Sequence, residues 1–181
     1  IKYFGLGCCP SKGDAMTTKA WGEGYKEQFL VDTGLSIQRE TGGWYDRFPG
    51  RVIFPIHSIS GRVIGFGGRI PKKNEKAAKY LNSPESVVYN KSQSLYGLYY
   101  AKNSIARENY CILVEGYTDG VQMLQSGVEN VVASAGTSLT TDQIKLQGRS
   151  AKKNTVIYAG TAVAIQDSLC VREMVRRGGR N

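Results

Sequence analysis

The second half of the chain alternates between short hydrophobic runs and segments with helical spacing. The hydrophobic runs are typical of buried strands and cover residues 110–116, 128–136 and 154–160. The segments between and after them predict helices at residues 118–127, 140–148 and 162–177. Strands that alternate with helices imply a parallel sheet, with functional groups at the carboxyl ends of its strands. Glu115, residues 134–138 and residues 159–161 are therefore expected along one edge.

The first half of the chain is rich in glycine and has a mixed pattern. Residues 25–35 have the spacing of a helix that ends at Gly34. Residues 51–56 and 62–68 predict two strands joined by a turn. Pro55 favours a sheet edge or a bulge for the first of these strands, because proline cannot donate a ladder hydrogen bond.

Residues 94–107 predict one more helix before the pattern changes. The overall prediction is an α+β protein of two parts. A basic mixed α/β subdomain covers residues 1–109, and an α/β domain with a parallel sheet covers residues 110–181.

The positive charge is concentrated in one segment of the chain. Of 24 lysine and arginine residues, nine lie in residues 47–91, together with only two of the 15 acidic residues. A localised basic field favours a polyanionic ligand, most often a nucleic acid, although a solvated basic surface is the alternative. No run of eighteen apolar residues occurs, so no membrane span is expected.

The chain begins without a methionine and without the pattern of a signal peptide, which suggests a segment of a longer protein. Its four cysteines have neither metal-ligand nor disulfide-framework spacing, so reduced thiols in the cytoplasm are expected.

The stretch "LVEGYTD" places an acid at the end of a predicted buried strand. Glu115 there is expected to be partly desolvated and to serve as a ligand for Mg²⁺ or as a general base. Asp119 lies in the first turn of the next predicted helix, where a carboxylate also simply favours the helix dipole. From spacing alone, a purely structural role stays open for both.

A second cluster combines glycine, basic and aromatic residues. "GGR" ends at Arg69, and "KYLNSPES" begins with Lys79 and Tyr80. The glycines would allow a phosphate to approach, the two cations would neutralise it, and Tyr80 could stack on a base. The tyrosines of "LYGLYY" could stack on bases too, but most of Tyr96, Tyr99 and Tyr100 are expected to be structural. His57 is expected to be a structural or surface residue and not a ligand.

Several motifs in a fixed order carry a family resemblance: "YDRF", "RVIFPI", "GRVIGFGGR", "KYLNSPE", "YNKS", "LYGL", "VEGYTD" and "VVAS.GTSLT". They resemble the catalytic core of bacterial DNA primases of the DnaG type over nearly the whole chain. The resemblance implies a basic subdomain followed by a TOPRIM domain, here truncated. It further implies template-directed synthesis of short RNA primers from nucleoside triphosphates on single-stranded DNA.

The resemblance also implies roles for single residues. Glu115 would be the metal ligand and catalytic acid or base, Asp119 a second catalytic residue, and Gly136 and Thr137 part of the neighbouring loop. The positions that would hold the phosphates of template, product and incoming triphosphate are Arg47, Arg51, Arg69, Lys79, Lys91 and Tyr117.

The third strand shows a departure from the family pattern. Where relatives carry an Asp-Gly-Asp turn that binds Mg²⁺, this chain has Ala159, Gly160 and Thr161. Pro49 likewise stands where many relatives have arginine. Hard divalent cations need several anionic oxygen ligands, so we expect Mg²⁺ or Mn²⁺ to bind weakly and catalysis by this chain to be unlikely.

The remaining expectations come from the family alone. Zinc would belong to an upstream module absent from this chain, and the replicative helicase would bind a C-terminal domain also absent. The partners would be a single-stranded DNA template, an RNA primer and nucleoside triphosphates, at the cytoplasmic replication fork. Two alternatives stay open: a non-catalytic single-strand-binding scaffold, and another TOPRIM enzyme such as a topoisomerase or nuclease.

Overall fold

The computed structural model describes residues 3–71, 77–134, 140–148 and 153–156. The chain divides into two compact units. The first contains Ile1–Ile56 and Val63–Asn90, and the second contains His57–Arg62 and Lys91–Asn181. Within the described ranges, no helix has both the length and the apolar character needed to cross a membrane.

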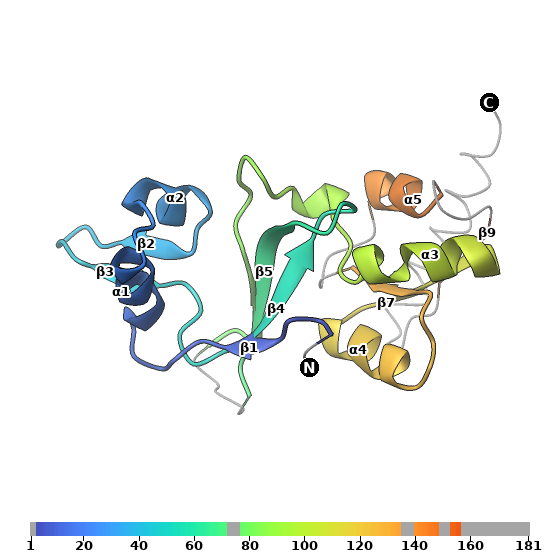
Figure 1. Ribbon diagram of the computed structural model, residues 1–181, viewed down its shortest axis with the longest axis horizontal. Helices are drawn as coiled ribbons and strands as arrows, with labels where there is room; N and C mark the ends of the chain where they lie inside the picture. Colours follow the sequence, from blue (N-terminus) through green and yellow to red (C-terminus); the bar gives the residue numbers. More distant parts are fainter. Residues whose placement is uncertain (1–2, 72–76, 135–139, 149–152, 157–181) are drawn as a thin grey trace. The chain divides into compact units, whose positions relative to one another are not determined.

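The first unit contains a four-stranded sheet in which β4 and β5 run side by side at the centre (Figure 1). The pairings of β1 with β4 and of β5 with β6 are antiparallel. Both strands predicted in this region are confirmed, and Gly61 lies in the turn between them with a φ of +90°. The strands, in sheet order, are β1 (Gly7–Cys8), β4 (Val52–His57), β5 (Val63–Arg69) and β6 (Tyr80–Asn82).

Pro55 lies in β4 beyond the part of that strand that β1 covers. As described, β1 pairs only with Val52 and Ile53. The predicted edge position is therefore wrong for the strand as a whole, because β4 lies between β1 and β5, but β1 is too short to form a ladder bond at Pro55.

Two short helices and a two-stranded antiparallel sheet complete the first unit. They are α1 (Ala15–Gly22), α2 (Glu27–Asp32), β2 (Ser36–Gln38) and β3 (Trp44–Asp46). The helix predicted over residues 25–35 is α2, shorter at both ends. Gly34 follows it in the left-handed region with a φ of +65°, as a helix-ending glycine does.

The side chain of Asp46 joins α1 to β3. It is fully buried, and its carboxylate accepts hydrogen bonds from the backbone N–H groups of Met16 (2.8 Å) and Thr17 (2.9 Å). The Thr17 hydroxyl donates a third, at 2.7 Å. The first turn of α1 leaves N–H groups without partners in the helix, and Asp46 satisfies two of them from a distant part of the chain.

The second unit is built on a parallel sheet of order β8-β7-β9, which confirms the prediction that these strands are parallel. Its strands are β7 (Tyr110–Val114), β8 (Val131–Ala133) and β9 (Lys153–Val156). The chain passes from β7 to β8 on one side of it and then crosses over to β9 on the other side. Because such crossovers are right-handed, the connecting helices α4 (Tyr117–Gln125) and α5 (Thr141–Gly148) lie on opposite sides of the sheet (Figure 1).

The helices of the second unit are α3 (Leu98–Glu108), α4 (Tyr117–Gln125) and α5 (Thr141–Gly148), with a 3-10 turn η1 (Lys91–Gln93) before them. Helix α3, which falls within the helix predicted over residues 94–107 except for its last residue, buries Leu98, Ala101 and Ile105 on one face. These residues pack with Leu113 and Val132 of the sheet into the core of this unit. The helix predicted over residues 162–177 lies outside the described residues.

The cysteines in the described part of the chain are free: Cys8, Cys9 and Cys111. Burial, followed by the neighbouring charge of Asp46, raises the pKa of the Cys9 thiol to about 11. Burial raises the pKa of Cys111 to about 12. Neither thiol is therefore a reactive thiolate at neutral pH.

Candidate nucleic-acid interface

The carboxyl end of β5 and the start of β6 bring two cations to one aromatic ring. Arg69 and Tyr80 face each other across the strand pair, and the Arg69 Nε donates to the Tyr80 hydroxyl at 3.1 Å. The guanidinium carbon of Arg69 lies 5.8 Å from the ring centroid, and the Lys79 ammonium lies 5.7 Å from it. Lys79 is exposed and Arg69 is half-buried. We call Arg69, Lys79 and Tyr80 the β5–β6 cluster.

This arrangement suits a nucleic-acid strand. Cation–π contacts hold the two positive side chains beside Tyr80 without neutralising them, so their charge stays available to a phosphate. A tyrosine beside such cations can also stack on a base, whatever the sequence. The cations and the aromatic ring that single-strand binding requires therefore lie together where β5 ends and β6 begins.

Arg47 approaches the same strand from the segment after β3. Its Nε donates to the carbonyl oxygen of Asn82 at 3.1 Å. Burial lowers the pKa of this guanidinium, and the smaller effect of Tyr45 raises it. One edge of the Arg47 guanidinium is therefore used within the protein, and the half-buried side chain can offer only its remaining donors to a phosphate.

Arg51 has a different environment from the one expected for a phosphate ligand. The side chain is buried, and its Nη1 donates to three carbonyl oxygens, those of Ala78 (3.0 Å), Gly68 (3.3 Å) and Lys79 (3.5 Å). Burial lowers its pKa. These contacts argue against the predicted phosphate role. Arg51 instead ties the carboxyl end of β5 to the segment that leads into β6.

The glycines of β5 also have a packing role that the sequence reading did not assign. A Cβ on Gly68 would lie 2.6 Å from Phe48 and 2.9 Å from the Arg51 side chain. A Cβ on Gly65 would lie 3.0 Å from the Tyr89 ring. Phe48, Arg51 and Tyr89 therefore pack directly against the β5 backbone, and their close approach explains these glycines better than contact with a phosphate does.

Lys91 belongs to the second unit, where it begins η1. The buried side chain of Gln143 donates to the carbonyl oxygens of Lys91 (3.1 Å) and Ser94 (2.9 Å). Thr140 donates to the carbonyl of Ser92 at 2.6 Å and accepts from the Gln143 N–H at 3.1 Å. The start of α5 thus fixes the backbone that carries Lys91.

Glu115 directly follows β7 at the carboxyl edge of the parallel sheet. Its side chain is exposed, so the expected partial desolvation is wrong. Ser134 follows β8 at the same edge, where its N–H donates to the carbonyl of Val114 at 3.1 Å. The sheet therefore presents the exposed Glu115 side chain where ligands of α/β proteins bind.

Asp119 and Tyr117 have structural roles in α4. The Asp119 carboxylate accepts from the Gly116 N–H at 3.1 Å, which caps the start of the helix. The Tyr117 side chain is buried, and its ring packs against that of Tyr96 with centroids 4.7 Å apart. A buried ring cannot contact the phosphates of a strand, so this placement argues against the phosphate role predicted for Tyr117.

The carboxylates in the described ranges do not by themselves form a metal site. No group of three or more His, Cys, Asp or Glu side chains there is placed to hold an ion. Glu115 is an accessible oxygen donor, but Asp119 is engaged in its cap. The other predicted members of this region lie outside the described residues: Gly136, Thr137, Ala159, Gly160 and Thr161. The donor set at hand therefore does not fit a tight Mg²⁺ site.

The tyrosines and histidine predicted to be structural are packed within the second unit. Tyr96 is buried against Tyr117. The His57 ring stacks on Tyr99 with centroids 5.9 Å apart and meets Tyr100 edge-on at 5.3 Å. Tyr96 is thus buried as expected, and the ring contacts of the half-buried His57, Tyr99 and Tyr100 agree with a mainly structural role.

Comparison with known families matches both parts of the chain. Residues 1–102 match the family described as DNA primase catalytic core, N-terminal domain, and residues 109–165 match the Toprim domain. The DNA primase of Clostridium acetobutylicum is 42% identical over 178 residues, covering 96% of this chain. The chain belongs to the DNA primase family. It spans 29% of the length of that relative.

Solved primase structures share the fold. The Escherichia coli primase catalytic core is 38% identical with a TM-score of 0.86, and the match covers 96% of this chain and 55% of that one. A DnaG primase catalytic domain bound to ssDNA is 39% identical with a TM-score of 0.85, covering 96% of this chain and 56% of that one. The predicted fold class and family are confirmed. The exact domain boundary near residue 109 and the roles of single residues stay predictions.

Two structural residues of this primase chain were missed by the sequence reading. Asp46 stands in the "YDRF" motif, but its role depends on α1, which lies some thirty residues earlier. Gln143 had a local signal, because Thr140 and Gln143 have the spacing of a capping box. The same two residues bond to the segment around Lys91, and this second set of contacts has no signature in the sequence.

Proposed function

We propose that this chain acts in the priming of DNA replication and that its first unit binds the single-stranded template. The reaction that this binding serves is the one of its family, the synthesis of a short RNA primer from nucleoside triphosphates. The β5–β6 cluster is the observation that carries the proposal. Its two cations and one tyrosine match the two general needs of single-strand binding, phosphate neutralisation and base stacking.

In this proposal the predicted phosphate residues take different parts. Arg69 and Lys79 contact the phosphates, and Arg47 adds its remaining guanidinium donors. Lys91 presents a further cation from η1 of the second unit, on a backbone that Gln143 and Thr140 hold. Arg51 and Tyr117 act indirectly, by supporting the elements that carry the others. That a primase catalytic domain of the same fold has been solved with ssDNA supports the choice of ligand.

The phosphate contacts are testable through salt dependence. Replacing Arg69 or Lys79 with alanine should weaken binding of a fluorescent oligodeoxythymidylate and reduce the slope of log K against log salt by about 0.7 each, the value for one contact to a single strand. Fluorescence anisotropy at a series of salt concentrations measures both quantities.

Lys19→Ala is the matched control, because it also removes one positive charge but from a lysine already paired with Glu23 at 2.9 Å. Its slope should equal that of the wild type. Unchanged slopes in both Arg69→Ala and Lys79→Ala would exclude the cluster as the template site.

A second candidate is template binding without catalysis, and the sequence at residues 159–161 favours it. Alanine and threonine there provide no carboxylate, and of the described acids at the start of α4 only Glu115 is exposed and outside the helix cap. We propose that Mg²⁺ binds this chain weakly and that DNA binding is indifferent to it. The chain would then hold a template without making a primer from it.

Restoring two acids tests this second candidate. The double variant Ala159→Asp with Thr161→Asp should bind Mn²⁺ roughly tenfold more tightly or better, because each carboxylate adds an anionic oxygen ligand. Isothermal titration calorimetry measures the affinity. Asn103→Asp with Ala106→Asp adds the same charge on α3 and serves as the control. Equal Mn²⁺ affinity in the wild type and the restored variant would contradict the idea of a lost metal site.

A further inference from the structure

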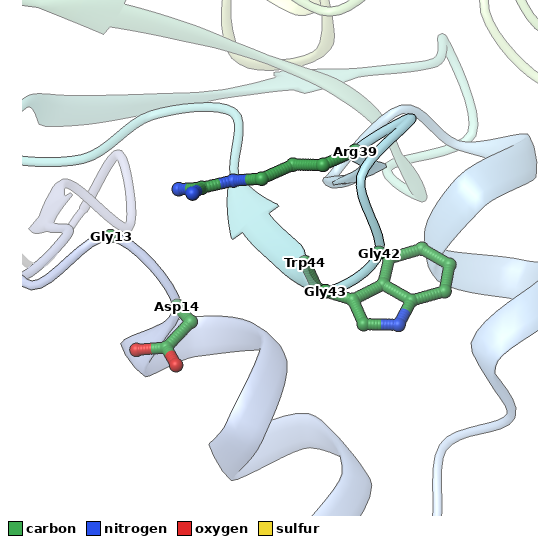
Figure 2. Close-up of a pocket in the computed structure, with 6 residues that line it drawn as sticks. All are labelled: Gly13, Asp14, Arg39, Gly42, Gly43 and Trp44. Carbon is green, nitrogen blue, oxygen red and sulfur yellow. The ribbon is translucent and has the colours of Figure 1, made fainter.

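The first unit contains a pocket apart from the β5–β6 cluster. It lies between the start of α1 and the hairpin of β2 and β3, and its volume is about 320 Å³ (Figure 2). That volume is at the lower end of the range for small-molecule sites, roughly 300–1,000 Å³. The pocket is lined by Gly13, Asp14, Arg39, Gly42, Gly43 and Trp44.

Glycines keep the pocket open. Gly42 and Gly43 both have a φ of +85°, a conformation that glycine adopts without strain. The N–H of Gly42 donates to the carbonyl of Arg39, and the N–H of Arg39 donates to that of Gly43, each at 3.0 Å. A Cβ placed on Gly13 meets no atom within 4 Å, so a side chain there would extend into open space.

The side chains around this space have three kinds of chemistry. Arg39 is exposed, its guanidinium lies 5.4 Å from the centroid of the Tyr45 ring, and it takes part in none of the ion pairs of the described residues. Asp14 is half-buried, with Lys12 at 3.6 Å as its ionic partner. Trp44 is half-buried and meets Trp21 at an interplanar angle of 88°.

Figure 2 shows how these groups surround the pocket. The Arg39 side chain extends away from the hairpin loop, on the same side of the view as the Asp14 carboxylate, and the Trp44 indole lies on the other side. An aromatic surface, a cation and a hydrogen-bond acceptor therefore border one cavity. The acid makes the pocket a poor site for a simple anion such as phosphate, because it would repel that anion.

We propose that this pocket binds one nucleotide. The base stacks on Trp44, the phosphate pairs with Arg39, and Asp14 accepts a hydrogen bond from an amino group of the base or a hydroxyl of the sugar. A nucleotide is the ligand class that joins an aromatic ring, an anion and hydrogen-bond donors in one molecule. The nucleotide can come from the single strand, an inference that rests on the proposed function, or from the pool of free nucleotides.

Tryptophan fluorescence provides a direct reporter because the chain has only two tryptophans. In the variant Trp21→Phe the emission comes from Trp44 alone, and stacking of a base should quench it. The full chain would be titrated separately with a short oligodeoxyadenylate, with adenosine monophosphate and with inorganic phosphate. We expect saturable quenching by the oligomer or by the mononucleotide and none by phosphate.

The titrations with the oligomer and with the mononucleotide identify the source of the ligand. Quenching by the oligomer alone assigns the pocket to the strand, and quenching by the mononucleotide at similar concentrations assigns it to free nucleotides. Trp44→Phe keeps Trp21 as the only reporter and should abolish the quenching by nucleotide. If Trp21→Phe does not fold, the comparison of Trp44→Phe with the wild type provides the same test. Quenching by neither nucleotide, or equal quenching by phosphate, overturns the proposal.

Gly13→Val blocks the pocket and completes the test. The valine side chain enters open space, so the fold should be kept, while nucleotide affinity falls by roughly five- to tenfold, as for loss of one stacked base. Gly22→Val, at another glycine with open space beside it, is the control. Equal affinities in the two variants overturn the proposal.

Fluorescence anisotropy with labelled DNA tests the proposed template site independently of the nucleotide pocket. Failure of the wild type to bind DNA, together with quenching by the mononucleotide, would overturn the proposed function and support the pocket. DNA binding without quenching by any nucleotide would support the proposed function and overturn the pocket proposal.

Discussion

Replacing Asp46 with alanine is expected to lower the free energy of unfolding by about 3–5 kcal/mol, because two buried donors and one half-buried donor lose their acceptor. Two of these donors are N–H groups in the first turn of α1, and the third is the Thr17 hydroxyl. The hydroxyl retains a contact with Ser36 at 2.6 Å, whereas none of the described residues offers the two N–H groups another acceptor. Urea denaturation of the wild type and the variant measures the difference.

Asp14→Ala is the informative control for this prediction. Asp14 occupies the position directly before α1, where a capping side chain is usual, yet its carboxylate makes no capping hydrogen bond. We therefore expect its replacement to change stability by less than about 0.5 kcal/mol, as for an ordinary surface substitution. A similar loss in both variants would mean that charge at the helix start, and not the buried contacts of Asp46, stabilises α1.

The parallel sheet was predictable from the sequence because its strands are continuous hydrophobic runs. Residues Ile112, Leu113 and Val114 are buried on both faces of the sheet, so no polar position interrupts them. Helix α4 follows β7 and helix α5 comes after β8, so the alternation along the chain gave the order of elements and the direction of the strands. The hydrophobic pattern along the chain was sufficient to predict this sheet, because the strands consist of buried residues and need no contact with a distant segment to be recognised.

The elements before β4 were less predictable for the opposite reason. Helix α1 contains adjacent threonines, Thr17 and Thr18, which disfavour a helix locally, and its main capping group is a carboxylate almost thirty residues away. Strands β2 and β3 have three residues each, too few to show alternation. Contacts between distant segments determine this region, and a pattern along the chain does not record them.

The same distinction applies to the candidate site. Arg69, Lys79 and Tyr80 belong to motifs in adjacent strands, and the register of β5 and β6 places them together as the sequence suggested. Charge alone could not separate Arg69 from Arg51, since both are arginines beside glycine-rich strands. Only the packing shows that Arg51 faces backbone carbonyls and Arg69 an aromatic ring.

This difference leads to opposite expectations for two arginine-to-alanine variants. Arg51→Ala should lower the free energy of unfolding by about 2–4 kcal/mol, because three buried or part-buried carbonyl contacts lose a charged donor and the packing of the Arg51 stem against β5 is lost. Arg69→Ala should cost less than about 1 kcal/mol, since its contacts are partly exposed. Thermal and urea unfolding of both variants measure these values.

In DNA binding we expect the opposite order, with a larger effect of Arg69→Ala than of Arg51→Ala. For the folded fraction of Arg51→Ala we expect the salt slope of the wild type, because the Arg51 guanidinium bonds to Ala78, Gly68 and Lys79 and neutralises no phosphate. For Arg69→Ala we expect the slope to fall by about 0.7, the value for one lost contact. Gly68→Ala should resemble Arg51→Ala, since its Cβ would displace the same guanidinium stem. A reduced slope in Arg51→Ala with an intact fold would return Arg51 to the phosphate-binding residues, and the β5–β6 cluster would then extend to the buried side of the sheet.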